Sequence, residues 1–90
     1  MAAIFVQHKV KDYNAWRRVY DSVGDMQKEG GVTAHSVYRA EGDPNTVLVY
    51  HKFPTIAKAR AFVANPALRD AMQKGGVDEK TMRVEFYNEA

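Results

Sequence analysis

The hydrophobic residues of this chain switch between two spacings, and the order of the switches limits the folds that the chain can adopt. Residues 3–10 alternate with period 2 and include several β-branched side chains, which predicts a strand with one buried face. Asp12, a good N-cap residue, then precedes apolar residues at the spacing of an amphipathic helix. This stripe consists of Tyr13, Trp16, Val19, Tyr20 and Val23. Gly30 and Gly31 end the predicted helix, because glycine readily takes the left-handed conformation that follows a helix.

The middle of the chain returns to period 2. Residues 32–40 and 46–53 both alternate, which predicts two more strands. The residues between them, Glu-Gly-Asp-Pro-Asn at 41–45, are typical of a turn. The two strands are therefore expected to form a hairpin.

A second helix and a last strand complete the pattern. Thr55 is a good N-cap for a second apolar stripe, and Gly75 follows the last residues of that stripe. Asn65-Pro66 interrupts this helix, because Asn caps a helix well and Pro is favoured at the first helical position. We therefore expect the helix to break there and restart. Residues 81–88 alternate as a final strand.

The predicted order is thus β-α-β-β-α-β, which is the ferredoxin-like arrangement of the α+β class. Right-handed crossovers place both helices on one face of a four-stranded antiparallel sheet. The other face is left bare in a single chain, and large apolar residues are predicted to lie on it: Phe5, Tyr38, Leu48, Tyr50 and Tyr87. An exposed patch of this kind predicts a homodimer in which two sheets pack face to face.

Length and composition exclude several classes of protein. Ninety residues predict one domain, 1–90, and the absence of cysteine excludes disulfides, thiolate metal sites and cysteine nucleophiles. The 13 basic and 11 acidic residues are interspersed, which argues against binding to nucleic acid or to a membrane surface. The start of the chain has no basic segment followed by a long apolar one, so a signal peptide is not expected. We therefore expect a cytoplasmic protein.

Five segments of the chain carry a family resemblance. They are His8–Trp16 (HKVKDYNAW), Gly31–His35 (GVTAH), Asp43–Asn45 (DPN), Ala59–Phe62 (ARAF) and Asn65–Met72 (NPALRDAM). With these segments the chain resembles the dimeric α+β barrel superfamily, in particular its antibiotic-biosynthesis monooxygenase-like and small "cyclase"-labelled proteins. The resemblance covers nearly the whole chain and is carried by the pattern of strands and helices rather than by a catalytic motif.

The resemblance implies a homodimer that acts on a small molecule without a cofactor. Members of the superfamily include cofactor-independent oxygenases of aromatic polyketides, lactone isomerases and haem-degrading enzymes. The haem-degrading members hold the haem with a histidine of the second helix, and residues 55–75 of this chain contain no histidine. The function expected from the resemblance is therefore cofactor-independent oxidation, or cyclisation or isomerisation, of an aromatic or polyketide-like compound. A non-catalytic ligand-binding or assembly protein with the same dimeric fold is the alternative.

The three histidines, His8, His35 and His51, are the main candidates for chemistry. Each shares its strand face with apolar neighbours, so all three are expected on the face that the helices cover. If the hairpin turn pairs Arg39 with Val47, the same register places His35 opposite His51. Because the first and third strands of this fold are neighbours, His8 is also placed within reach of His51.

Three interpretations of the histidines remain open at this stage. They are separate hydrogen-bonded residues at the rim of the core, or acid–base and hydrogen-bonding groups of a substrate cleft, or the ligands of a metal. No local His-x-His pair supports the metal interpretation. In the cleft interpretation His8, His35 and His51 are the catalytic candidates. Trp16 and Phe62 then form apolar walls, and Arg39 binds a substrate oxyanion.

Overall fold

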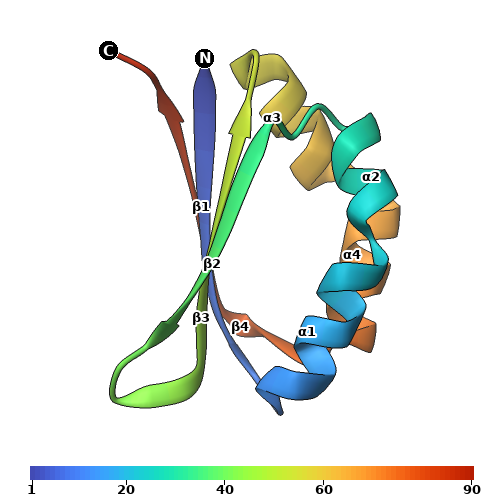
Figure 1. The fold of residues 1–90 in the computed structure, drawn as a ribbon, viewed down its shortest axis with the longest axis vertical. Coiled ribbons are helices and arrows are strands. Elements are labelled where there is room, and N and C mark those ends of the chain that lie inside the picture. The colour runs from blue at the N-terminus through green and yellow to red at the C-terminus, as the bar shows by residue number, and fades with distance from the viewer.

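The strands form one antiparallel sheet with the order β2-β3-β1-β4, in a computed structural model that describes all 90 residues. The strands are β1 (Ala2–Val10), β2 (Ala34–Ala40), β3 (Asp43–Phe53) and β4 (Val77–Asn88). The helices are α1 (Tyr13–Ser22), α2 (Gly24–Glu29), α3 (Ile56–Ala64) and α4 (Pro66–Lys74). All four helices lie on the same side of the sheet, and its other side is uncovered (Figure 1). The predicted ferredoxin-like α+β fold is therefore confirmed.

Side-chain caps start three of the four helices. Asp12 accepts a hydrogen bond from the Ala15 backbone N–H at 2.9 Å, and Thr55 caps α3 in the same way. Asn65 ends α3 and accepts from the Ala67 N–H at 3.0 Å, so the predicted break and restart at this residue is confirmed. The first predicted helix also divides, at Val23, into α1 and α2. The element order is therefore β-α-α-β-β-α-α-β.

The strand boundaries differ from the predicted ones by two or more residues at three places. β2 begins at Ala34, whereas β3 extends back to Asp43, because Asp43 pairs with Ala40 and leaves only two residues in the turn. β4 begins at Val77, four residues earlier than predicted, because Val77 pairs with Val10 at the end of β1. The added pairs carry register shifts, which the sequence alternation alone does not reveal.

The register of the hairpin is as predicted, with Arg39 opposite Val47 and His35 opposite His51. The expected approach of His8 to His51 is wrong. On β1 the residue opposite His51 is Ile4, and His8 lies four positions further along, opposite Val47. Four residues of strand span about 13 Å. His8 and His51 therefore occupy different parts of the same sheet face.

Buried residues fill the space between the sheet and the helices in two clusters. One consists of Val10, Trp16, Tyr20, Val47 and Val49, and the other of Ile4, Phe53, Ala59 and Phe62. None of the helices is long and apolar enough to cross a lipid bilayer.

The uncovered face of the sheet carries an aromatic patch. The Phe5 ring centroid lies 5.4 Å from that of Tyr50 and 5.5 Å from that of Tyr87. Tyr38 is 58% exposed and Tyr87 is 49% exposed. The face thus has the predicted apolar character and is not covered within the chain.

Candidate functional site

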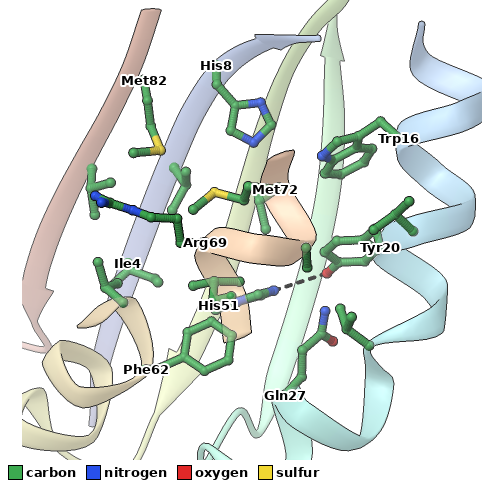
Figure 2. A pocket seen from close by; sticks show the side chains of 18 residues that line it. Ile4, His8, Trp16, Tyr20, Gln27, His51, Phe62, Arg69, Met72 and Met82 are labelled. Atoms are coloured by element: carbon green, nitrogen blue, oxygen red, sulfur yellow. Dashed lines mark hydrogen bonds between the residues drawn. The ribbon is translucent and has the colours of Figure 1, made fainter. Parts of the chain in front are cut away.

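A cavity of about 140 Å³ lies between the sheet and the helical layer. It is lined by 18 residues from three strands and all four helices, and 14 of these residues are hydrophobic. Its polar lining residues are His8, Gln27, His51 and Arg69, and Tyr20 adds a hydroxyl group (Figure 2). An apolar cavity with a few polar groups is the usual form of a site that binds a small molecule.

His51 lies between Tyr20 and Phe62 on the wall of the cavity (Figure 2). Its side chain projects from β3 and is 4% exposed, and its Nε2 atom lies 3.0 Å from the Tyr20 hydroxyl. Its Nδ1 atom is buried and has no hydrogen-bond partner. Burial, together with the nearby His35, lowers the pKa of His51 to about 4. His51 is therefore neutral near pH 7, and its Nδ1 atom makes no hydrogen bond.

Tyr20 connects His51 to the surface. Its hydroxyl oxygen lies 2.9 Å from Nδ1 of His35 and 3.0 Å from Nε2 of His51. The Tyr20 ring is stacked on Trp16 with a centroid separation of 5.0 Å, which fixes the position of the hydroxyl. Burial raises the pKa of Tyr20, so its hydroxyl stays protonated. His35 itself is exposed on the edge strand β2. A continuous hydrogen-bonded chain thus runs from the cavity to solvent.

His8 provides a second buried imidazole near Trp16, away from His51 (Figure 2). It is 3% exposed, and its ring centroid lies 5.8 Å from that of Trp16. Its Nδ1 atom also lacks a hydrogen-bond partner, and burial lowers its pKa. The cavity therefore contains two neutral histidines that each have an unpartnered nitrogen.

Known proteins match this chain in structure but not in sequence. No protein-family model and no curated protein matches the sequence. SnoaB, a cofactor-independent oxygenase from Streptomyces nogalater, matches with a TM-score of 0.79 over 99% of this chain and 92% of its own, at 11% identity. A protein provisionally named an antibiotic biosynthesis monooxygenase, from Deinococcus radiodurans, matches with a TM-score of 0.76 over 100% and 93%, at 12% identity. The chain has the fold of the antibiotic biosynthesis monooxygenases.

The same fold also occurs in a conserved protein from Methanosarcina mazei. It matches with a TM-score of 0.78 over 99% of this chain and 92% of its own, at 12% identity. The matches to SnoaB and to the Deinococcus radiodurans protein confirm the predicted structural resemblance to the monooxygenase-like proteins. At such low identity the likeness concerns the fold, and function has to be argued from the site.

Within this monooxygenase fold, four of the six predicted site residues line the cavity: His8, Trp16, His51 and Phe62. His35 does not line it and is connected to it only through Tyr20. The three histidines form no group that could hold a metal ion. The metal interpretation of the three histidines therefore has no support in the geometry.

Arg39 does not lie at the cavity, contrary to its predicted role in binding a substrate oxyanion. Its guanidinium carbon lies 3.9 Å from the centroid of the Tyr13 ring, and its Nε donates to the Pro44 carbonyl at 2.9 Å. The predicted strand face is correct. However, β2 is an edge strand, and this end of it extends beyond the cavity.

Tyr20 and Arg69 are the functional candidates that sequence reasoning missed. Tyr20 was expected to be a packing residue only, although a buried tyrosine hydroxyl usually has a hydrogen-bond partner. This preference of buried tyrosines for a hydrogen-bond partner was the one sequence-based indication that Tyr20 could contact the histidines. Arg69 lies on an exposed turn of α4, and its side chain forms none of the ion pairs of the chain, which join Arg17 to Asp21 and Lys74 to Asp70. Its guanidinium is therefore available to a ligand.

The buried histidines predict that the protein loses stability in mild acid. The unfolded chain protonates His51 near the ordinary pKa of 6.5, whereas the folded chain does so only near pH 4. Between these values the unfolded state binds more protons, so stability is complete above pH 6.5 and falls as the pH is lowered toward 4. At 1.36 kcal/mol per pKa unit the loss is about 3 kcal/mol. Urea unfolding measured from pH 7.5 to 4 checks this loss.

The His51→Gln variant is the control for this prediction, because glutamine does not titrate. Its free energy of unfolding should depend less on pH over the same range, and the remaining slope should come largely from His8, whose pKa burial also lowers. Asp43 has a lowered pKa, so it contributes only below its ordinary value of 3.8, outside this range. An equal pH dependence in the variant and the wild type contradicts the assignment to His51.

Proposed function

We propose that this protein is an enzyme that oxidises a small, single-ring aromatic compound with dioxygen and without a cofactor. The observation that carries the proposal is the unpartnered Nδ1 atom of His51 on the wall of an apolar cavity. A cavity of about 140 Å³ matches the size that accommodates a benzene-like ring, whereas drug-sized ligands need about 300 Å³ or more. The size therefore favours a single ring over a polyketide with several fused rings.

In the proposed reaction the substrate is an electron-rich phenol held between Trp16 and Phe62. Its hydroxyl group donates its proton to the Nδ1 atom of His51, and Arg69 stabilises the phenolate that forms. The phenolate transfers electrons from the ring to dioxygen, and a carbon–oxygen bond forms at the ring carbon para to the hydroxyl. The resulting hydroperoxide loses water, and that carbon becomes a carbonyl. Phenol and dioxygen are thus converted to a quinone and water.

The proposal is tested with electron-rich single-ring phenols that carry a hydrogen at the para carbon, such as catechol monoethers, and with anthracene-sized phenols as controls. Oxygen consumption and quinone absorbance report turnover. Trp16 is the only tryptophan and lines the cavity, so quenching of its fluorescence reports binding. We expect quenching and oxygen consumption with the single-ring compounds only. Turnover without oxygen consumption indicates cyclisation or isomerisation instead, and an absence of both quenching and turnover contradicts the proposal.

A second candidate function is non-catalytic binding of the same kind of ligand. It is favoured by the low pKa of about 4 at His51, because a group with this pKa is a weak base toward a phenol. Quenching of Trp16 fluorescence by single-ring phenols, with no oxygen consumption and no change in the ligand, supports this candidate over the enzyme.

The proposed enzyme is a homodimer assembled through the aromatic patch of the open sheet face. We expect the wild type to scatter light as a particle of twice 10.2 kDa. Phe5 lies at the centre of the patch between Tyr50 and Tyr87, so Phe5→Lys places a charge in the interface and should give a particle of 10.2 kDa. Ala61→Lys, at an exposed position of α3, should remain dimeric. A monomeric wild type at micromolar concentration contradicts this assembly.

A further inference from the structure

The Tyr20 hydroxyl lies between two imidazoles but has only one hydrogen to donate. It lies 2.9 Å from His35 Nδ1 and 3.0 Å from His51 Nε2. The side chain of Gln27 also lies close enough to act on the hydroxyl as a hydrogen-bond donor, which leaves the one Tyr20 hydrogen to be shared between the two imidazoles. A neutral imidazole has one N–H group and one bare nitrogen. Tyr20 therefore donates to one histidine and accepts from the other, and the tautomers of His35 and His51 depend on each other.

Two arrangements satisfy both hydrogen bonds. In the first, Tyr20 donates to His35, His51 donates from Nε2, and the Nδ1 atom of His51 is bare. In the second, His35 donates from Nδ1, Tyr20 donates to His51 Nε2, and the His51 Nδ1 carries a hydrogen. The first arrangement uses the Nε2–H tautomer at both histidines, which is the intrinsically favoured one for a histidine side chain. It also offers an acceptor to a ligand hydroxyl, and the second offers a donor.

We propose that Tyr20 and His35 conduct protons between His51 and solvent. A proton taken up at His51 Nδ1 is matched by the loss of the Nε2 proton to the Tyr20 oxygen. The Tyr20 hydrogen moves to His35 Nδ1, and His35 then releases its Nε2 proton to water. One proton enters from the cavity, one leaves to solvent, and the chain passes from the first arrangement to the second. The source of the proton, a ligand hydroxyl, rests on the proposed function.

This path accounts for how a buried histidine can act as a base. A lasting positive charge on His51 is unfavourable, because burial lowers its pKa to about 4. Along the path the charge appears only on His35, which is exposed and solvated. Tyr20 and His35 are positioning and relay residues in this scheme, and His51 is the group that contacts the ligand.

The charged groups around the path do not compete for its protons. Arg17 lies above the Tyr20 ring, with its guanidinium carbon 5.3 Å from the centroid, and is paired with Asp21 at 3.0 Å. The cavity wall contributes two further basic groups, His8 and Arg69, and no carboxylate. His35 is therefore the group of the path that exchanges protons with water.

The test is the pH dependence of the His51 tautomer in the protein alone. When His35 becomes cationic, its Nδ1 must donate to Tyr20, so Tyr20 must donate to His51 Nε2. Side-chain ¹⁵N NMR distinguishes a bare from a protonated ring nitrogen. In the wild type we expect His51 Nδ1 to change from bare to protonated as the pH is lowered. A His51 tautomer that does not change with pH in the wild type overturns the proposal.

Two variants test whether Tyr20 and His35 conduct protons or only support the structure. Tyr20→Phe removes the hydroxyl and should abolish the pH response of the His51 tautomer. His35→Ala changes an exposed residue, should fold normally, and should abolish the same response, which added imidazole should restore. A response that persists in folded His35→Ala without imidazole overturns the proposal. The measurement needs no substrate, so a failure to find oxygenase activity leaves it unaffected.

Discussion

Replacing His51 with glutamine is expected to lower the turnover of a single-ring phenol by about 10²- to 10⁴-fold, the usual effect of losing a positioned acid–base group. Glutamine has a hydrogen-bonding amide of similar reach, so it can still bond Tyr20 and a ligand hydroxyl. It cannot take up a proton at one atom and release another proton elsewhere. Ligand binding, measured by quenching of Trp16 fluorescence, should therefore change much less than the turnover number.

The comparison variant for His51→Gln is Arg18→Gln, which alters an exposed residue of α1 outside the cavity lining. It should retain wild-type oxygen consumption. Equal losses of binding and turnover in His51→Gln indicate that His51 only holds the ligand. Full turnover in a folded His51→Gln protein excludes His51 as the base.

Replacing Trp16 with alanine is expected to lower the free energy of unfolding by about 3–5 kcal/mol, the usual range for a buried tryptophan. Trp16 is 4% exposed and packs against three aromatic rings, those of His8, Tyr13 and Tyr20. A 90-residue domain has only about 5–10 kcal/mol of total stability, so this loss is a large part of it. Urea denaturation followed by far-ultraviolet circular dichroism measures the change.

The cavity gives this prediction a second readout. Trp16 lines the cavity, so its removal enlarges the cavity and leaves space for a planar ligand. Indole, which has the shape of the missing side chain, should bind Trp16→Ala and raise its free energy of unfolding, with little effect on the wild type. Arg18→Ala, on the exposed face of the same helix, should change stability by less than about 0.5 kcal/mol. A loss below about 1 kcal/mol in Trp16→Ala contradicts the packing role.

The histidines show which features of a site can be predicted from strand alternation and which cannot. Alternation placed all three on the helix-covered face, and hairpin register placed His35 opposite His51. It did not place His8 relative to His51, because the register between β1 and β3 is set by contacts distant in sequence rather than by a turn. The predicted role of Arg39 was wrong for a related reason. The sheet face on which Arg39 lies was predictable from alternation. How far the cavity extends along the edge strand was not, because that depends on where the helices lie.

The sequence by itself determined the order of the strands and helical stretches, although not the division at Val23, and it determined the caps at Asp12, Thr55 and Asn65 and the aromatic character of the open sheet face. These features depend on residues within a few positions of one another, so a spacing is enough to reveal them. Only the tertiary structure decided that Tyr20 lies between His35 and His51 and that Arg69 reaches the cavity. Those contacts depend on the rotation of α1 and α4 above the sheet, which is fixed by packing between distant segments.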